Sequence, residues 1–272
     1  MEAFWARIIE PSGQPGLNYW EYFAERLAQL SNIFNSSVIL DLGTYDGNVL
    51  IKAMKKMKTF GYGVGADNYF GGFKDGVADV LEQGLDEYVA FVQTDASALG
   101  CLPETFQTVL ANFIGWDDYF DFERMEFINS DLMMAEIMRV LRPGGQVGIG
   151  SWVEQSDIDW IISAFKKYLP GHGNNITCYS KENPEGQKVI LQNSGFEDIQ
   201  VYVETRNFVL PGAEIWWQQM RQAAGEYFKQ VSDPDILESF KEQVLIDLEQ
   251  FHYPEGIRFS KTVSFAFGSK PV

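Results

Sequence analysis

The sequence predicts an α/β fold in which helices cover both faces of a mostly parallel, doubly wound sheet. Two observations lead to this prediction. Short apolar segments alternate with stretches of helical periodicity through the first two-thirds of the 272 residues, and these segments show little polar alternation. Strands of that kind are buried on both faces, as in a parallel sheet flanked by helices. With 46% hydrophobic residues, the chain can form a sizeable core and is not disordered.

Each element follows from its local pattern. The stretches 49–57 and 134–141 carry apolar residues at helical spacing, and 199–205 alternates at period two as a strand does. The run 262–267 is apolar and is expected to be the last strand. The buried strands expected earlier in the chain lie at 38–42, 61–66, 88–92, 108–113 and 146–153.

We expect one domain in which additions surround a core. Aromatic and apolar residues at helical spacing between Trp20 and Leu30 favour a helical N-terminal cap, and those from Trp216 onward predict two inserted helices. The expected parts are the cap at 1–36, the core at 37–153, its C-terminal half at 154–210, the helical insertion at 211–258 and the last strand at 259–272.

Composition and charge narrow the function classes. The 21 Lys and Arg stand against 38 Asp and Glu, a net charge of −17, which argues against nucleic acid and anionic lipid as partners. The chain has no run of about 18 apolar residues, so no membrane span is predicted, and no secretory signal is visible. Cys101 and Cys178 do not form a disulfide framework or a metal-type cluster. We therefore expect a cytoplasmic protein with two reduced thiols.

A glycine-containing turn follows the first predicted strand, in the segment Asp41-Leu42-Gly43-Thr44-Tyr45-Asp46-Gly47-Asn48. In a doubly wound sheet this turn lies at the ligand-binding edge, and the following helix offers free N–H groups to a carboxylate or phosphate. The dinucleotide fingerprint needs glycine where Tyr45 and Asn48 stand, so an NAD-dependent oxidoreductase is a remote alternative. No Walker A sequence is present. The turn also fits a purely architectural role.

Acidic residues follow the next two strands. Asp67 ends the second strand, about 20 residues after the turn, where a carboxylate can accept both ribose hydroxyls of a nucleotide. Asp95 follows the third strand. Each has a simpler interpretation as a turn residue, and Asp95 in particular can cap the backbone near Ser97.

These features together resemble one family. The segment 38–43 resembles the first motif of class I S-adenosylmethionine-dependent methyltransferases, commonly Asp-x-Gly-x-Gly-x-Gly, with Tyr45 at the middle glycine. Asp67, Asp95 and the Pro143-Gly144-Gly145 turn before the fifth strand follow in the family's order, over about residues 36–153. The resemblance implies a Rossmann-like, seven-stranded sheet with only the last strand antiparallel.

The resemblance also implies a cofactor, S-adenosylmethionine, with S-adenosylhomocysteine as product. Its methionine carboxylate would lie at the glycine turn, its amino group near Asp41, its ribose at Asp67 and its adenine at Asp95. The residues implied for cofactor binding are Asp41, Gly43, Thr44, Tyr45, Gly47, Asp67, Asn68, Asp95, Ala96 and Asn112.

The expected activity is in-line methyl transfer to a small-molecule acceptor. The chain reads Asn112-Phe113-Ile114-Gly115 where enzymes acting on nucleobases or amides carry a Pro-Pro pair, which argues with the charge against nucleic acid. No general base is identified; Asp117, Asp118 and His172 are candidates, each with a simpler role in a solvated loop. No metal site is expected. The alternative is a protein of the same fold that binds the cofactor or a related nucleoside without transferring methyl. The acceptor and the oligomeric state stay open.

Overall fold

The structure is a computed structural model that describes residues 5–9, 15–128, 131–171 and 182–272. Its residues cluster into two compact units, which we call the sheet unit and the helical unit. The sheet unit comprises Glu21–Val153, Ser180–Val203 and Val263–Val272, and the helical unit comprises Met1–Trp20, Glu154–Tyr179 and Glu204–Thr262. Four elements contribute residues to both: helix α1 (Tyr19–Leu30) and the strands β9 (Leu141–Gln155), β10 (Glu197–Leu210) and β12 (Gly256–Ser269). The assignment of the whole chain to one domain stays a prediction.

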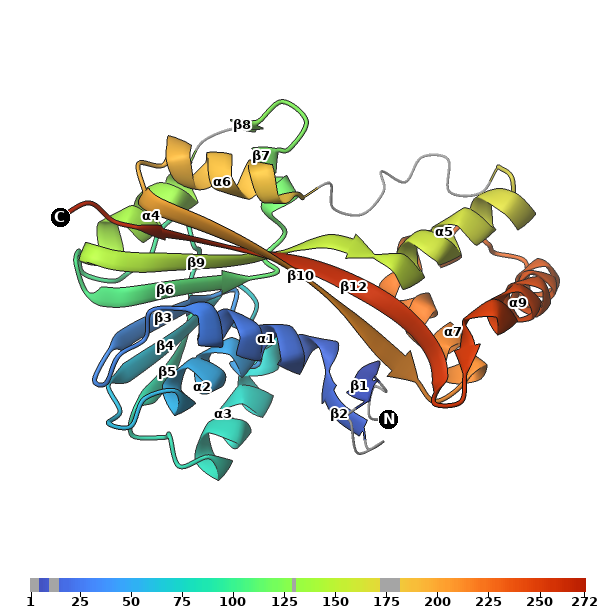
Figure 1. Cartoon of the computed structure of the whole chain (residues 1–272), viewed down its shortest axis with the longest axis horizontal. Coiled ribbons are helices and arrows are strands. Elements are labelled where there is room, and N and C mark those ends of the chain that lie inside the picture. Colours follow the sequence, from blue (N-terminus) through green and yellow to red (C-terminus); the bar gives the residue numbers. More distant parts are fainter. Residues whose placement is uncertain (1–4, 10–14, 129–130, 172–181) are drawn as a thin grey trace. The chain divides into compact units, whose positions relative to one another are not determined.

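The sheet unit contains the predicted parallel strands with their helices (Figure 1). Its strands are β3 (Val38–Leu42), β4 (Tyr62–Asp67), β5 (Val89–Gln93), β6 (Phe106–Asn112), β9 (Leu141–Gln155), β10 (Glu197–Leu210) and β12 (Gly256–Ser269), the last three only in part. Two short strands, β7 (Phe120–Asp121) and β8 (Glu126–Phe127), pair separately. Its helices are α1 (Tyr19–Leu30), α2 (Asn48–Lys55), η1 (Phe70–Gly72), α3 (Phe73–Glu82), η2 (Trp116–Asp118), α4 (Leu132–Val140) and α6 (Pro184–Asn193).

The strand order in the sheet unit is β5-β4-β3-β6-β9-β12-β10. Strand β3 pairs in parallel with β4 and with β6, and β6 pairs in parallel with β9. The start of β9 lies beside Lys270, directly after the end of β12: the N–H of Gly144 donates to the Lys270 carbonyl (2.9 Å) and the N–H of Lys270 donates to the Gly145 carbonyl (2.8 Å). The neighbouring strands β9 and β12 thus run in opposite directions (Figure 1). The antiparallel last strand is therefore confirmed.

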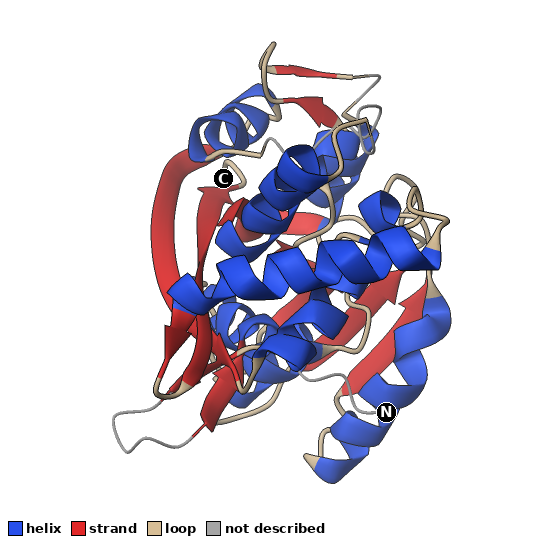
Figure 2. Ribbon diagram, turned by 90° about the vertical axis from the view of Figure 1, so that its right-hand side faces the viewer, coloured by secondary structure: helices blue, strands red, loops and turns tan. Residues whose placement is uncertain are grey.

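Helices lie on both faces of these parallel strands (Figures 1 and 2). On one face, Leu40 and Leu42 of β3 belong to a buried cluster with Ile137 of α4 and Ile190 of α6. Because side chains alternate along a strand, Asp41 belongs to the opposite face. The doubly wound arrangement that the apolar runs predict is confirmed.

The strand count differs from the expected seven, since the sheet has ten strands within the described residues. The additional members are β1 (Arg7–Ile9), β2 (Pro15–Asn18) and β11 (His252–Tyr253). Strand β1 pairs antiparallel with β10 and with β2, and β11 pairs antiparallel with β12, so the expectation that only the last strand is antiparallel is wrong. Segments of two to four residues are too short to show a period, so sequence patterns do not reveal them. The N-terminal cap therefore contains helix α1 preceded by two short strands, where Pro15 and Gly16 disfavour a helix.

The helical unit contains the predicted insertion. Its helices are α5 (Ser156–Tyr168), α7 (Ala213–Ala223), α8 (Gly225–Phe228), α9 (Pro234–Leu248) and η3 (Glu249–Phe251). Aromatic side chains form its core: the Phe165 ring lies 4.4 Å from that of Phe240 and 4.9 Å from that of Phe228. Asp233 caps α9 by accepting from the N–H groups of Asp235 and Ile236.

Within the described residues, no helix is long and apolar enough to span a membrane. Cys101 is a free, half-buried thiol, whereas Cys178 lies outside the described residues.

Candidate functional site

The turn between β3 and α2 has the backbone that the glycine motif requires. Gly43, Tyr45 and Gly47 all have left-handed backbones, with φ of 66°, 47° and 76°. A Cβ at Gly43 would lie 2.5 Å from Ile114, and one at Gly47 would lie 2.7 Å from the Phe91 ring, so both positions demand glycine. Tyr45 keeps the left-handed conformation at a steric cost, and its side chain is 54% exposed. Tyr45, which stands at the middle glycine of the motif, thus has the left-handed backbone that glycine adopts readily.

Asp41, at the end of β3, is buried beneath this turn. Its Oδ2 accepts from the Thr44 hydroxyl at 2.7 Å, and only 1% of the residue is exposed. Burial raises the pKa of Asp41 to about 7, although the bonds from Thr44 and from the Leu50 N–H oppose this shift. Neither partner is charged, so a cationic group at this carboxylate would stabilise its ionised form.

Asp67, at the end of β4, accepts hydrogen bonds from the backbone of two loops. Its Oδ2 accepts from the Tyr45 N–H and its Oδ1 from the Tyr69 N–H, both at 2.9 Å. The Tyr45 and Tyr69 rings lie nearly parallel, with centroids 6.4 Å apart. Each carboxylate oxygen retains a second lone pair, so Asp67 can still accept from hydroxyl groups of a ligand. The neighbouring Asn68 is exposed, and its carbonyl accepts from the Gln93 side chain at 3.0 Å.

Asp95 adopts the turn geometry that is its simpler interpretation. Its Oδ1 accepts from the N–H and the hydroxyl of Ser97, at 2.8 and 2.7 Å, and these bonds lower the pKa of Asp95. The residue is exposed and the adjacent Ala96 is half-buried. A contact of Asp95 with adenine stays a prediction.

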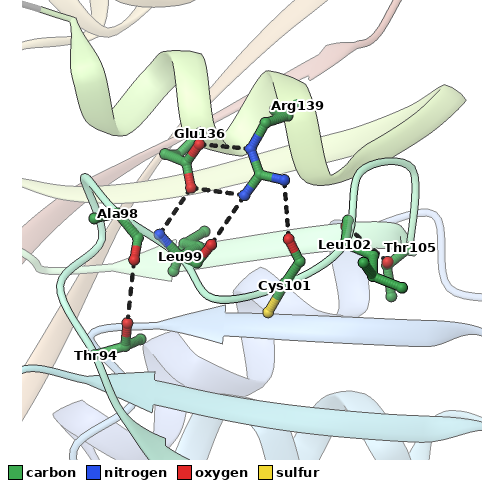
Figure 3. A network of polar contacts seen from close by, with 8 residues as sticks. All are labelled: Thr94, Ala98, Leu99, Cys101, Leu102, Thr105, Glu136 and Arg139. Atoms are coloured by element: carbon green, nitrogen blue, oxygen red, sulfur yellow. Dashed lines mark hydrogen bonds and ion pairs between the residues drawn. The ribbon is translucent and has the colours of Figure 1, made fainter.

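An ion pair on α4 fixes the loop that carries Asp95 and Ala96 (Figure 3). The Glu136 carboxylate accepts from the Leu99 N–H at 2.7 Å and from the Arg139 guanidinium at 2.6 Å. Arg139 also donates to the carbonyls of Leu99 and Cys101, both at 2.9 Å. Because this pair bonds backbone groups, it holds the loop in one conformation at the carboxyl end of β5.

Asn112, the last residue of β6, carries an unusual polar atom. Its side-chain Oδ1 is buried and has no hydrogen-bond partner among the described residues. The next residue, Phe113, has a left-handed backbone with φ of 56°, and its ring stacks on that of Trp152 at 4.0 Å. The end of β6 thus combines an unsatisfied acceptor with a flat aromatic surface, whereas Ala111 is fully buried in the core.

Glu182 is a further buried carboxylate at this end of the sheet unit, and no sequence motif marks it. It precedes α6, is 5% exposed, and accepts from the N–H groups of Trp116 and Asp117. The nearby Ser151 hydroxyl favours the charged form of Glu182. Its Oγ does not meet the geometric criteria for a hydrogen bond to any described residue. Burial and the nearby Asp117 charge raise the pKa of Glu182. Nothing in the local sequence distinguishes Glu182 from an exposed helix-start glutamate, so only the fold reveals it.

The remaining candidates are less informative. Asp117 and Asp118 are exposed in η2, consistent with a solvated loop. His172 lies outside the described residues. Among the described residues, no group of three or more His, Cys, Asp or Glu side chains could hold a metal ion.

No protein-family model matches the chain, and no curated protein matches it in sequence. Solved structures do match. A Bacillus halodurans protein classed with the methyltransferases superposes with a TM-score of 0.59 at 16% identity, over 92% of this chain and 99% of that one. The chain has a methyltransferase fold. At this identity the likeness concerns the fold alone.

Two other solved structures that match this chain are named for the reactions of their proteins. A Haemonchus contortus phosphoethanolamine N-methyltransferase, solved with phosphomonomethylethanolamine and S-adenosylhomocysteine, has a TM-score of 0.52 at 16% identity, over 94% of this chain and 53% of that one. The [4+2]-cyclase SpnF has a TM-score of 0.56 at 16% identity, over 99% and 89%. The same methyltransferase fold is therefore found in proteins named for different reactions.

Proposed function

We propose that the chain is an S-adenosylmethionine-dependent methyltransferase that acts on a small-molecule acceptor. The observation that carries this proposal is the turn after β3. There, three alternate residues have left-handed backbones, between the buried Asp41 and the loop-fastening Asp67. In a methyltransferase fold this turn lies at the carboxyl ends of the parallel strands, where ligands bind in doubly wound sheets.

The residues at this edge fit the cofactor. The left-handed turn leads into the N-terminus of α2, which suits the methionine carboxylate. Asp41 has no charged partner among its described contacts and would hold the amino group. Asp67 would accept from the ribose hydroxyls, and the unsatisfied Oδ1 of Asn112 would accept from a donor of the methionine portion. Gly43, Thr44, Tyr45, Gly47, Asn68, Asp95 and Ala96 complete the proposed set.

Methyl transfer requires the chain mainly to align the methyl donor with the acceptor. When bound, S-adenosylmethionine supplies a methyl group that its sulfonium has already activated for in-line displacement. The side chains at the strand ends would orient the two reactants and exclude water. The Phe113 and Trp152 pair offers a flat apolar surface for this purpose. A small acceptor, a cytoplasmic location and the absence of nucleic-acid and membrane partners are part of the proposal, supported by the net charge of −17.

Calorimetric titration with S-adenosylhomocysteine tests the cofactor site. The wild-type chain is expected to bind, and Asp67→Ala to bind roughly tenfold more weakly, the scale of a lost charged hydrogen bond. Asp86→Ala, at an exposed aspartate after α3, is the matched control and should leave affinity unchanged. A wild-type chain without measurable affinity would overturn the proposal, whereas an unaffected Asp67→Ala variant would overturn only the ribose assignment.

A binding protein without transfer activity is the second candidate. This candidate is supported by the similarity to a structure named as a cyclase, because the fold is then not confined to methyl transfer. Labelled methyl groups from S-adenosylmethionine, offered with a panel of small amines, phenols and carboxylic acids, separate the two. Label on any acceptor excludes the second candidate.

A further inference from the structure

Two polar side chains on α7 are buried in the helical unit without a hydrogen-bond partner among the residues that the structure describes. Trp216 is 0% exposed and Gln219 is 4% exposed. The atoms without a partner in this part of the chain are the indole Nε1 of Trp216 and both amide atoms of Gln219. The adjacent Gln218 is exposed. Helix α7 therefore presents one glutamine to solvent and the next to the interior.

These unsatisfied atoms are costly for a folded chain. Buried polar groups are nearly always hydrogen-bonded, and each one left unsatisfied costs about 1–3 kcal/mol. Residues three apart in a helix lie on the same face, so Trp216 and Gln219 direct their polar groups from one stretch of α7. Of the six such side-chain atoms in the described residues, three belong to this pair. A concentration of this kind points to a binding partner outside the chain.

The surroundings of Trp216 are aromatic. Its ring lies 5.3 Å from that of Trp160 on α5, edge to face. It lies 5.9 Å from the Phe259 ring on β12, with an angle of 21° between the planes. All these residues belong to the helical unit. Trp216 thus offers a neutral donor among flat apolar side chains, and Gln219, three residues further along α7, offers a neutral donor and a neutral acceptor.

We propose that Trp216 and Gln219 form a binding site for a neutral ligand that carries a carboxamide or lactam group on an aromatic or apolar body. The indole N–H and the Gln219 Nε2 donate to the ligand carbonyl, and the Gln219 Oε1 accepts from the ligand N–H. The pair supplies no counter-charge, so a carboxylate or ammonium group would be desolvated there without compensation. The site lies within one unit, so its test is independent of S-adenosylhomocysteine binding.

Thermal unfolding of the full chain with three probes of similar size tests the site: benzamide, benzoate and benzylammonium. Millimolar benzamide is expected to raise the Tm of the wild-type chain by a few degrees, and the two charged probes to leave it unchanged. Gln219→Leu, which removes two unsatisfied atoms, should raise the ligand-free Tm and abolish the benzamide shift. Gln218→Leu is the matched control and should keep the shift.

A second variant guards against a folding defect. Trp216→Phe keeps an aromatic ring against Trp160 and Phe259 but removes the N–H, so it should weaken the benzamide shift at a near-native Tm. The proposal is overturned when benzamide fails to stabilise the wild-type chain, when Gln219→Leu keeps the full shift, or when that variant lowers the ligand-free Tm. The S-adenosylhomocysteine shift, recorded in parallel, should be equal in all these variants, and its absence would count only against the cofactor proposal.

Discussion

Two buried aspartates, one in each unit, are stabilised in opposite ways. Asp157 in the helical unit is 2% exposed, and its two oxygens accept from Lys261 Nζ at 2.8 and 3.0 Å. Lys261 is equally buried and also lies over the Tyr19 ring. Asp41 in the sheet unit is 1% exposed, yet its described partners are a hydroxyl and a backbone N–H.

The difference separates a structural carboxylate from one prepared for a ligand. A buried charge costs several kcal/mol unless an opposite charge lies beside it. Asp157 has such a charge within the chain. Asp41 lacks one among its described contacts, and its raised pKa records that cost. A cation supplied from outside would offset the cost, which is what the amino group of the proposed cofactor would do.

The largest expected effect concerns the neutralised pair. Lys261→Met leaves the Asp157 charge buried without its cation, so we expect a loss of about 3–5 kcal/mol in the free energy of unfolding. Urea unfolding at neutral pH measures this loss. The control is Lys241→Met, because the Lys241–Glu214 pair is partly exposed and its loss should cost less than about 1 kcal/mol.

The double variant Asp157→Leu with Lys261→Met sharpens this result. Removing both charges removes the uncompensated ion, so most of the stability lost in Lys261→Met should return. If Lys261→Met is as stable as the wild-type chain, the Asp157–Lys261 ion pair contributes nothing to stability. The contrast with Asp41 would then have no energetic basis.

The next effect concerns Asp41 and pH. The pKa of Asp41 is raised from 3.8 to about 7, so the folded chain holds this proton below pH 7 while the unfolded chain has released it. Folding stability from this group therefore falls as pH rises from about 4 to about 7. Binding of the cationic amino group should release the proton, so S-adenosylhomocysteine affinity should fall up to about tenfold per pH unit below 7.

Calorimetry at pH 6, 7 and 8 in two buffers of different ionisation enthalpy measures this proton release. Asp41→Asn keeps the size of the side chain and should lose both the proton release and the pH dependence. Affinity that does not change between pH 6 and 8 in the wild-type chain would contradict a contact between Asp41 and the amino group.

The smallest expected effect concerns Glu182. Burial raises its pKa, so stability from this group falls as pH rises above the usual range of a glutamate carboxyl. The backbone N–H groups of Trp116 and Asp117 oppose this shift, because they stabilise the ionised carboxylate. Glu182→Gln should flatten the pH dependence of the free energy of unfolding. Glu185→Gln, at the start of α6, should leave it unchanged.

Much of the sheet unit could be predicted from local patterns. The run 38–42 coincides with β3, and a turn follows it at the predicted glycines, Gly43 and Gly47. Asp67 was placed at the end of β4 by chain position alone, and its role in fastening two loops follows from that place. Glu182 could not be predicted, because its neighbours in η2 and β9 lie far from it in the sequence.

The doubly wound core is predictable from local sequence, because buried parallel strands and their helices show apolar patterns that can be recognised without knowledge of distant contacts. The positions of the carboxylates at the strand ends are predictable in the same way. Which polar groups are buried, and which charges neutralise them, is visible only in the folded chain. Gln218 and Gln219 are identical residues in one helix, and Asp41 and Asp157 are identical in chemistry. Their environments differ because burial and counter-charge come from residues far apart in the chain, as Lys261 is from Asp157.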